Sequence, residues 1–326
     1  MTLDLDTLED VLEGDSAAVW RRLIDRVHDV CGAAIDGDVA KAIREREQEV
    51  GELDDLISTS AWDLWNAFQT GVPRTSDELK TFWKRPHVGK AILILDGLSM
   101  RELPHLIKGA SDHGLKVLTN KVTASEIPPE TDPFAAALGF SSRSALSGAP
   151  KSPFFPDAKT TVTDMDWGSC TKLLTPDPHW IVWHKMPDDR IHGLENDGDA
   201  LGRLSRELAV EFSGDAFWEL VLKLTTGRAL VITSDHGYAC GGAFFEMPEG
   251  PTEFLRETFK GRRSLRGDGD LGNGSPPLVM VLQTSDGPYR LAIGRRKWKV
   301  PGGFPKLTHG GLTIFEVLSP YVEISR

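Results

Sequence analysis

The residues of this sequence best suited to chemistry lie in Ser234–Gly237, a Ser-Asp-His-Gly stretch that directly follows a run of β-forming residues. That run, Leu230–Thr233, predicts a buried strand, so Asp235 and His236 fall where the strand gives way to a loop. In an open α/β sheet, ligands bind at the carboxyl ends of the strands. An adjacent aspartate and histidine can face one metal ion there, although a strand followed by a polar turn also explains this stretch when it is taken alone.

Three other stretches supply complementary ligands. Asp96 follows the apolar run Ala91–Leu95, where a bare carboxylate is costly to bury unless it meets a cation or caps a helix. Asp188 and His192 are four residues apart and share one face of a helical turn, a spacing that many chains contain by chance. His309 precedes two glycines, which indicates a close backbone approach to a site. Three carboxylates and three histidines suit two divalent cations, which polarise a phosphoryl oxygen and lower the pKa of a hydroxyl.

Taken in order, these motifs resemble the metal-ligand pattern of the alkaline phosphatase superfamily, and within it they are most similar to PglZ-domain proteins. The resemblance covers roughly Lys90 to the C-terminus. It is carried by Ile94–Ser99, Asp188–His192, Ser234–Tyr238 and Leu307–Gly311, with Glu316 and Pro320 after the last. It implies an alkaline-phosphatase-like fold, in which a mostly parallel sheet is sandwiched by helices.

The resemblance also implies two metal sites. One is formed by Asp96, Asp235 and His236. The other is formed by Asp188, His192 and His309. Zn²⁺ is the ion that we expect at both, with Mn²⁺ as the alternative.

A threonine or serine that bridges the first metal ion is implied as the nucleophile. The family places it at a helix start after the second strand, where the helix dipole and free amides favour a phosphoryl oxygen. Thr131 is our candidate, because Pro133 and the apolar residues after it are typical of the first turns of a helix. Thr123 and Ser125 are alternatives, and a plain N-cap is the other interpretation of Thr131.

The activity implied by the resemblance is metal-dependent hydrolysis of a phosphoester. Thr131 would attack phosphorus in line, and the second ion would stabilise the leaving oxygen and then activate water. The resemblance favours phosphodiesters, including nucleotides and oligonucleotides, and a bacterial phage-defence or signalling system that would supply protein partners. Phosphomutases, sulfatases and phosphonate hydrolases belong to the same superfamily, so the substrate class is the least fixed of these expectations.

Two functions of other classes are open. The chain could be a non-catalytic PglZ-type scaffold or a partner-binding component of a defence complex, although a complete set of six ligands favours the enzyme. Alternatively, the helical N-terminus could dock a larger partner and the α/β part could serve as its scaffold. Two bound metal ions together with turnover would distinguish the enzyme from both.

Hydrophobic periodicity predicts a helical segment followed by an α/β domain. Residues 1–88 are predicted to form helices without a catalytic signature, as an accessory segment or a layer that covers the sheet. The resemblance implies that residues 89–326 form the catalytic domain. Strands are expected at Ala91–Leu95, Leu115–Leu118, Trp180–Trp183, Ala229–Thr233 and Leu278–Leu282. Tyr289–Ile293 and Trp298–Val300 are typical of a hairpin.

Composition limits where the protein acts and what it binds. A net charge of −11 argues against wholesale binding to a phosphate backbone, and part of it is neutralised if the acidic ligands hold metal. Basic clusters at 260–266 and 295–299 are interpreted as solvated loops, with a groove for an anionic substrate as the alternative. No apolar run is long enough to cross a membrane, the acidic N-terminus does not resemble a signal peptide, and three widely spaced cysteines suit a reducing compartment. We therefore expect a cytoplasmic protein.

Overall fold

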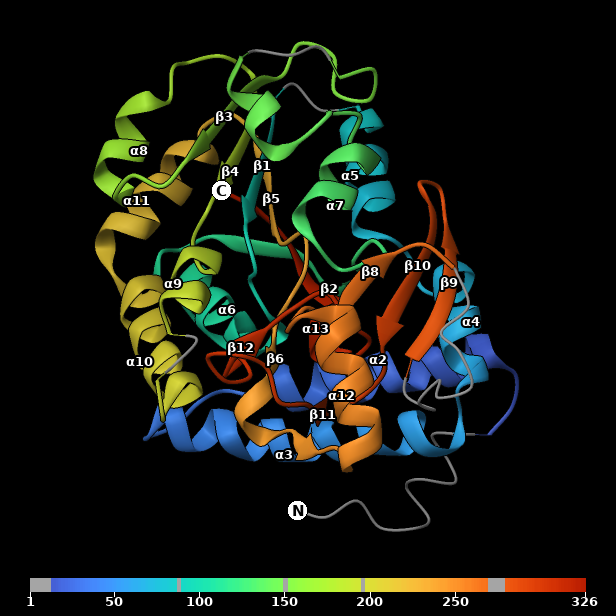
Figure 1. The fold of residues 1–326 in the computed structure, drawn as a ribbon. Coiled ribbons are helices and arrows are strands. Elements are labelled where there is room, and N and C mark those ends of the chain that lie inside the picture. The colour runs from blue at the N-terminus through green and yellow to red at the C-terminus, as the bar shows by residue number, and fades with distance from the viewer. Residues whose placement is uncertain (1–12, 87–88, 149–151, 195–196, 269–278) are drawn as a thin grey trace.

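One six-stranded sheet forms the centre of the protein (Figure 1). The computed structural model describes residues 13–86, 89–148, 152–194, 197–268 and 279–326. The strand order is β2 (Lys116–Ala124), β13 (Leu318–Ser325), β5 (Ala229–Thr233), β1 (Lys90–Leu95), β4 (His179–His184) and β3 (Lys159–Thr163). Strands β3, β4, β1 and β5 are parallel, whereas β13 runs antiparallel to both β5 and β2. The predicted α/β fold with a mostly parallel sheet is confirmed.

Both faces of the sheet are buried, and alternate residues of its strands belong to two hydrophobic cores. On β1, Leu93 and Leu95 lie in the larger core, whereas Ile92 and Ile94 lie in the smaller one. Successive side chains of a strand point to opposite faces, so a strand covered on both sides is apolar at every position. This is why the continuous run Ala91–Leu95 forms an interior strand.

Helices sandwich the sheet (Figure 1). The larger core is covered by α2 (Ser16–Gly32), α3 (Val39–Ser60), α4 (Asp63–Gly71), η1 (Met100–Glu102), α6 (Leu103–Asp112), α8 (Trp167–Leu173), α9 (Asp188–Gly193), α10 (Ala200–Ser213), α11 (Asp215–Leu224) and α13 (Ile314–Val317). The smaller core is covered by α5 (Thr75–Lys84), α7 (Thr131–Ala137) and η2 (Arg143–Gly148). The helices of the N-terminal segment therefore share both cores with the strands.

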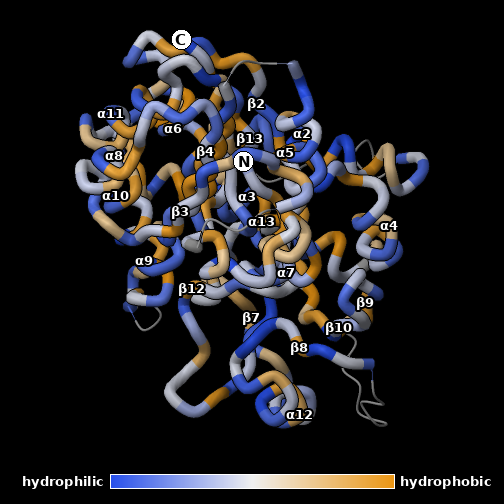
Figure 2. The backbone as a smooth tube through the Cα atoms, turned by 90° about the horizontal axis from the view of Figure 1, so that it is seen from above, coloured by the Kyte–Doolittle hydropathy of each residue, from blue (hydrophilic) through white to orange (hydrophobic). Residues whose placement is uncertain are grey.

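A smaller unit is inserted between β6 (Ala239–Cys240) and β12 (Leu307–Thr308), which pair antiparallel, so that the chain leaves and returns at one place. This insertion, residues 241–306, contains η3 (Gly241–Ala243), β7 (Phe245–Glu246), α12 (Glu249–Phe259), β8 (Ser264–Arg266), β9 (Val279–Thr284), β10 (Gly287–Ala292) and β11 (Arg296–Lys297). Leu255, Phe259, Ala292 and Trp298 form its own small core. In Figure 2, α12, β7 and β8 lie together on one side of the molecule, apart from α10 and α11.

The hairpin predicted from Tyr289–Ile293 and Trp298–Val300 is wrong. Strand β10 pairs with β9 and β8, and β11 pairs with β7. Trp298 is buried in the core of the insertion, where its ring contacts Phe259 and Phe304. Its apolar character therefore reflects side-chain packing and not strand pairing. The strand expected at Leu278–Leu282 corresponds to β9, although Leu278 itself lies outside the described residues.

The helices and cysteines of the described residues bear on the expectations about membrane spans and disulfides. None of its helices has both the length and the apolar composition that a membrane crossing requires. Cys31, Cys170 and Cys240 are buried free thiols. Burial raises the pKa of the Cys31 thiol to about 12, so the neutral form is strongly favoured there.

Candidate metal centre

The carboxyl ends of neighbouring strands bring the predicted ligands together. Strands β1 and β5 are parallel neighbours, so Asp96 and Asp235 leave the sheet side by side. The Gly97 N–H donates to Asp235 Oδ1 at 3.1 Å, across the two loops. Strand β4 flanks β1 on its other side and leads into α9, whose first residue is Asp188. The Asp188 N–H donates to the Asp96 carbonyl oxygen at 2.9 Å, which fixes α9 against the end of β1.

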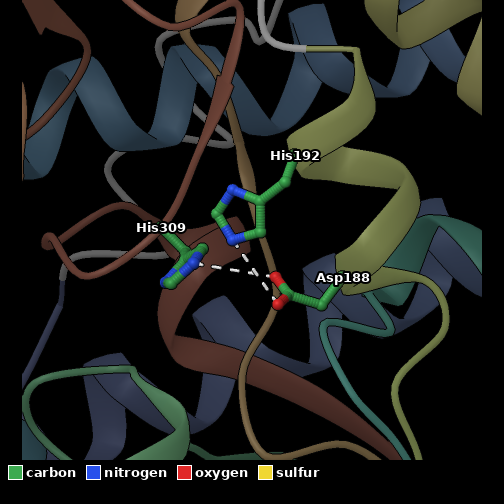
Figure 3. A group of neighbouring side chains, drawn as sticks. All are labelled: Asp188, His192 and His309. Carbon is green, nitrogen blue, oxygen red and sulfur yellow. Dashed lines mark ion pairs between the residues drawn. The ribbon is translucent and has the colours of Figure 1, made fainter. Parts of the chain in front are cut away.

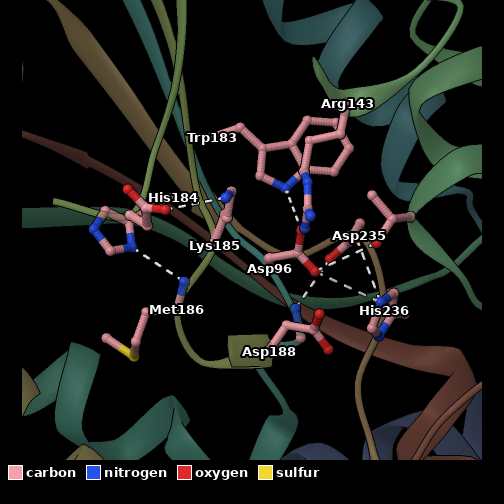
Figure 4. A network of polar contacts seen from close by, with 12 residues as sticks. Asp96, Arg143, Trp183, His184, Lys185, Met186, Asp188, Asp235 and His236 are labelled. Atoms are coloured by element: carbon pink, nitrogen blue, oxygen red, sulfur yellow. Dashed lines mark hydrogen bonds and ion pairs between the residues drawn. The ribbon is translucent and has the colours of Figure 1, made fainter. Parts of the chain in front are cut away.

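Asp96, Asp235 and His236 form a fully buried group (Figure 4). His236 Nε2 lies 3.5 Å from Asp235 Oδ2 and 3.7 Å from Asp96 Oδ1. The other ring nitrogen, Nδ1, lies 2.9 Å from the Gly237 carbonyl oxygen. If Nδ1 carries the proton and donates to that carbonyl, Nε2 has a lone pair facing the two carboxylates, which is the arrangement of a metal-binding histidine.

Asp188, His192 and His309 form a second group at the surface end of the same site (Figure 3). His192 Nε2 lies 3.5 Å from Asp188 Oδ2, and His309 Nε2 lies 3.7 Å from Asp188 Oδ1. The side chain of His192 is 53% exposed, whereas that of Asp188 is 10% exposed. A ligand could therefore enter from the His192 side.

The two groups are continuous through Asp188. Ligand atoms of Asp96, Asp188 and His236 lie within 4.8 Å of one another, as do those of Asp188, His192 and His309. The rings of His236 and His309 stack with their centroids 4.3 Å apart. All six residues named from the sequence thus lie in one cluster.

The His-Gly-Gly motif holds His309 against the cluster. Gly310 has φ of +99°, a conformation that residues with a Cβ adopt at a cost. Glu316 accepts the Gly311 N–H at 2.9 Å, and its other contacts include an ion pair with Arg263 at 2.8 Å. The buried carboxylate of Glu316 therefore fixes the turn that presents His309.

The pKa values of Asp96 and Asp188 are shifted in opposite directions. Burial raises the pKa of Asp96 well above its ordinary value, and the neighbouring charge of Asp235 raises it further. Burial acts in the same direction on Asp188, but hydrogen bonding with His192 and the charges of nearby histidines outweigh it and hold the pKa of Asp188 below its ordinary value. Without a cation, ionisation of Asp96 is therefore unfavourable.

The histidines respond in opposite directions. Burial alone would lower the pKa of His236, but the carboxylates of Asp235 and Asp96 outweigh it and raise the pKa to about 9. Burial lowers the pKa of His309 to about 3, and the adjacent charge of His236 adds to that effect. A single proton on His236 thus takes the place that a cation would hold between the carboxylates.

Several ligand atoms have no hydrogen-bond partner within the described residues, although they are buried. These are Asp188 Oδ1, Asp235 Oδ2 and His236 Nε2. An unsatisfied buried acceptor costs roughly 1–3 kcal/mol, and more if it is charged. Because the atoms converge and combine carboxylate oxygens with imidazole nitrogens, the residues fit divalent cations such as Zn²⁺ or Mn²⁺.

Thr131 begins α7 and faces this cluster. Its Oγ1 donates to Asp96 Oδ1 at 3.4 Å, and its side chain is partly exposed. The alternatives lie elsewhere in the interior: Thr123 Oγ1 bonds to Thr75 Oγ1 at 2.7 Å, and Ser125 Oγ bonds to a serine of β13. Both alternatives are completely buried. Of the three hydroxyls, only that of Thr131 contacts a predicted ligand.

Arg143 and Trp183 also contact the cluster, and the sequence analysis missed both. The Arg143 guanidinium forms an ion pair with Asp96 Oδ2, and Trp183 Nε1 donates to the same oxygen at 2.9 Å (Figure 4). Their contacts occupy Oδ2 and leave Oδ1 towards His236 and Thr131. Arg143 lies in a serine-rich stretch that carries no motif, so nothing in the sequence distinguishes it from a solvated surface cation.

Comparison with known proteins finds similarity among solved structures. No family model matches the sequence, and no curated protein matches it. Murine ectonucleotide pyrophosphatase/phosphodiesterase 5 is similar at 13% identity and a TM-score of 0.46, over 72% of this chain and 87% of that one. Phosphonoacetate hydrolase from Sinorhizobium meliloti 1021, in complex with phosphonoformate, is similar at 15% identity and a TM-score of 0.42, over 73% and 90%. At these values, the function of this chain must be inferred from its own residues.

Proposed function

We propose that this protein is a metal-dependent phosphodiesterase of the alkaline phosphatase superfamily, with Thr131 as its nucleophile. The observation that carries the proposal is the convergence of three carboxylates and three histidines, with the Thr131 hydroxyl against Asp96. Within the described residues, Asp188 Oδ1, Asp235 Oδ2 and His236 Nε2 are buried there without a hydrogen-bond partner. Asp96, Asp235 and His236 would hold one ion, and Asp188, His192 and His309 the other. When bound, the ions would supply Lewis-acid polarisation of the phosphoryl group and lower the pKa of a hydroxyl.

The protein's own residues perform the remaining tasks. Thr131 Oγ1 attacks phosphorus and gives its proton to solvent, and the bond from phosphorus to the leaving alkoxide breaks. The alkoxide takes up a proton from solvent, and a phosphothreonine ester forms. Attack by water on phosphorus then breaks the bond to Thr131 Oγ1, releases the phosphate monoester that carries the second substituent of the diester, and restores the hydroxyl. Arg143 uses one part of its guanidinium on Asp96, and its remaining N–H groups would bind a non-bridging phosphoryl oxygen.

Space on two sides of the cluster supports a diester over a monoester. A cavity of about 360 Å³ is lined by Thr131, Arg143 and His309, among others. A second cavity of about 740 Å³ is lined by His192 and His309, and the two share Glu130 as well. A phosphorus atom at their junction would have room for a substituent in each direction. The motif resemblance extends the proposal to nucleotide or oligonucleotide substrates and to a bacterial defence or signalling system.

The test compares hydrolysis of bis-p-nitrophenyl phosphate and p-nitrophenyl phosphate by protein loaded with Zn²⁺ or Mn²⁺. We expect metal-dependent turnover that prefers the diester, and Thr131→Ala should lower kcat by about 10³-fold or more. Ser125→Ala is the matched control, because it removes a buried hydroxyl that does not touch the cluster, and it should retain activity. Full activity of Thr131→Ala would rule out the nucleophile, and an absence of metal binding would favour a non-catalytic scaffold.

A further inference from the structure

A groove with a positive lining runs from the metal centre along the insertion. The cavity of about 740 Å³ is lined by His192 and His309 and also by residues of the segments 260–266 and 300–305. Lys260, Arg262 and Arg266 lie along it and are exposed. In Figure 2 the segment from α12 to β8 stands apart from the helices that cover the sheet, and much of the tube there is hydrophilic.

The cations of this groove are poorly balanced by acids. Within the described residues, no carboxylate pairs with Lys260 or Arg262, whereas Arg266 is paired with Asp286 at 2.9 Å. The lining contains one carboxylate, Glu130, which hydrogen-bonds to a serine of β8. An excess of positive charge at this place is notable in a chain whose net charge is −11. The groove is therefore suited to an anion that arrives at the metal centre.

The segment with these cations is fixed to the metal centre. Arg263 lies between Arg262 and Arg266 in the sequence, and its side chain is buried. It forms an ion pair with Glu316, with 2.8 Å between Nε and Oε1. Its Nη2 also donates to the Gly294 carbonyl oxygen at 2.9 Å. Because Glu316 also holds the turn after His309, Lys260 and Arg262 are anchored to the same carboxylate as a metal ligand. Buried contacts thus hold the backbone that carries these two cations.

The groove also offers surfaces that a base can contact. The partly exposed ring of Tyr289 lines it, together with the aliphatic side chains of Leu265 and Val300. Cations that track a backbone, combined with aromatic rings on which bases stack, are the usual features of single-strand binding sites. Inorganic polyphosphate would use the cations alone.

Resting on the proposed function, we infer that the groove binds the leaving-group strand of a single-stranded oligonucleotide. Thr131 lines the smaller cavity and not the groove, so a substituent in the groove points away from the nucleophile. In an in-line displacement, that substituent is the leaving group. Lys260 and Arg262 contact phosphates beyond the scissile one, and Tyr289 contacts a base.

Binding is tested first, with a fluorescein-labelled hexathymidylate and metal-loaded Thr131→Ala protein, by fluorescence anisotropy. Adding Lys260→Ala and Arg262→Ala should raise Kd about tenfold or more and reduce the slope of log K against log salt by about 1.4, since each phosphate contact on a single strand contributes about 0.7. The control pair is Lys116→Ala with Lys172→Ala, which removes two exposed cations outside the groove. Equal binding by the groove variant and its parent would overturn the inference, as would an equal loss in the control pair.

Turnover and competition separate the remaining possibilities. In the protein with Thr131 intact, Lys260→Ala/Arg262→Ala should lower kcat/KM for the oligonucleotide about tenfold and leave that for bis-p-nitrophenyl phosphate within about twofold. Competition by inorganic polyphosphate that is stronger than by unlabelled hexathymidylate would reassign the groove to polyphosphate. Binding that depends on Lys260 and Arg262 in a protein that hydrolyses neither substrate would support the groove and refute the proposed activity.

Discussion

At the scale of single residues, the proposed chemistry depends on buried charged groups that a cation or a proton must neutralise. Asp96 illustrates this: one oxygen is occupied by Arg143 and Trp183, and the other is left facing His236 and Thr131. A buried carboxyl also occurs outside the proposed metal centre, where Asp54 on α3 is 1% exposed. Among the described residues, no group of metal-type ligands includes Asp54, so its charge can be removed only by binding a proton.

Asp54 should make the stability of the protein depend on pH. Burial raises its pKa to about 8 in the folded protein, although its Oδ1 accepts the Ile314 N–H at 2.7 Å. The unfolded chain loses this proton near pH 4, so Asp54 destabilises the fold progressively as pH rises from about 4 to about 8. Asp54→Asn keeps an acceptor oxygen without the charge. We expect it to be more stable than wild type by a few kcal/mol at pH 8, and by much less at pH 5.

Urea unfolding of wild type and Asp54→Asn at the two pH values measures this difference. Asp25→Asn, which neutralises an exposed carboxylate on α2, is the control and should follow the wild type. An Asp54→Asn variant whose midpoint differs from that of wild type by the same amount at pH 5 and pH 8 would contradict the expectation.

At the scale of elements, close contacts between loops hold the ligands in place. The loop after β5 carries Asp235 and His236 and then passes directly against α13 at Gly237. The Gly237 N–H donates to the Glu316 carbonyl oxygen at 3.1 Å. A Cβ on Gly237 would lie 2.1 Å from the carbonyl oxygen of Phe315, a backbone atom that cannot rotate away. The turn around His309 is held by Glu316 of the same helix, so α13 supports ligands from both groups.

Gly237→Ala should therefore disturb the proposed metal centre through the backbone. Relief of the contact requires the loop or α13 to move, which displaces His236, and we expect about 2 kcal/mol or more of destabilisation and Zn²⁺ binding weakened at least about tenfold. Thermal unfolding and titration calorimetry measure the two effects. Gly193→Ala on α9 is the control, because a Cβ there has no heavy atom within 4 Å, and it should behave as wild type. Unchanged zinc affinity in Gly237→Ala would refute the role of this contact.

At the scale of the whole molecule, the N-terminal helices and the site are parts of one structure. Arg101, which is fully buried, forms an ion pair with Glu47 of α3. Its Nη1 also donates at 2.7 Å to the carbonyl oxygen of Tyr238, which is in the loop that carries Asp235 and His236. We propose that the predicted helical segment 1–88, of which the structure describes residues 13–86, acts there as a covering layer of the α/β domain, and not as an independent docking module.

Glu47→Ala should test this connection. It leaves the Arg101 guanidinium buried without its carboxylate, which typically destabilises a protein by about 3–5 kcal/mol. Glu45→Ala on the same helix is the matched control, because Glu45 is exposed and its ion pair with Lys41 is 3.8 Å long, so the loss should be below about 1 kcal/mol. Differential scanning calorimetry compares the two. Similar unfolding temperatures for both variants would contradict a structural role for the α3 contact.

The sequence by itself determined the class of fold and the ligands of the proposed metal centre. The continuous apolar run Ala91–Leu95 predicts a strand that is covered on both faces. Alternate side chains of a strand point to opposite faces, so a run without a polar residue has two apolar faces. Asp96, Asp188, Asp235 and His309 could be named because each stands beside a local signal, namely the end of an apolar run, a helical spacing or a pair of glycines. Local signals also gave Thr131, at a helix start.

Only the tertiary structure decided which distant segments meet. The incorrectly predicted hairpin is an example. Strand β10 pairs with β9 and β8, and the residues of β11 contain no local pattern that predicts its pairing with β7. Arg143 reaches Asp96 from a stretch without a motif. From the sequence, Lys260 and Arg262 are interpreted as part of a solvated loop. In the structure, the ion pair of Arg263 with Glu316 holds that loop beside His309. These are contacts between residues far apart in the chain, and their free energy depends on an arrangement in space that no local pattern of residue types specifies.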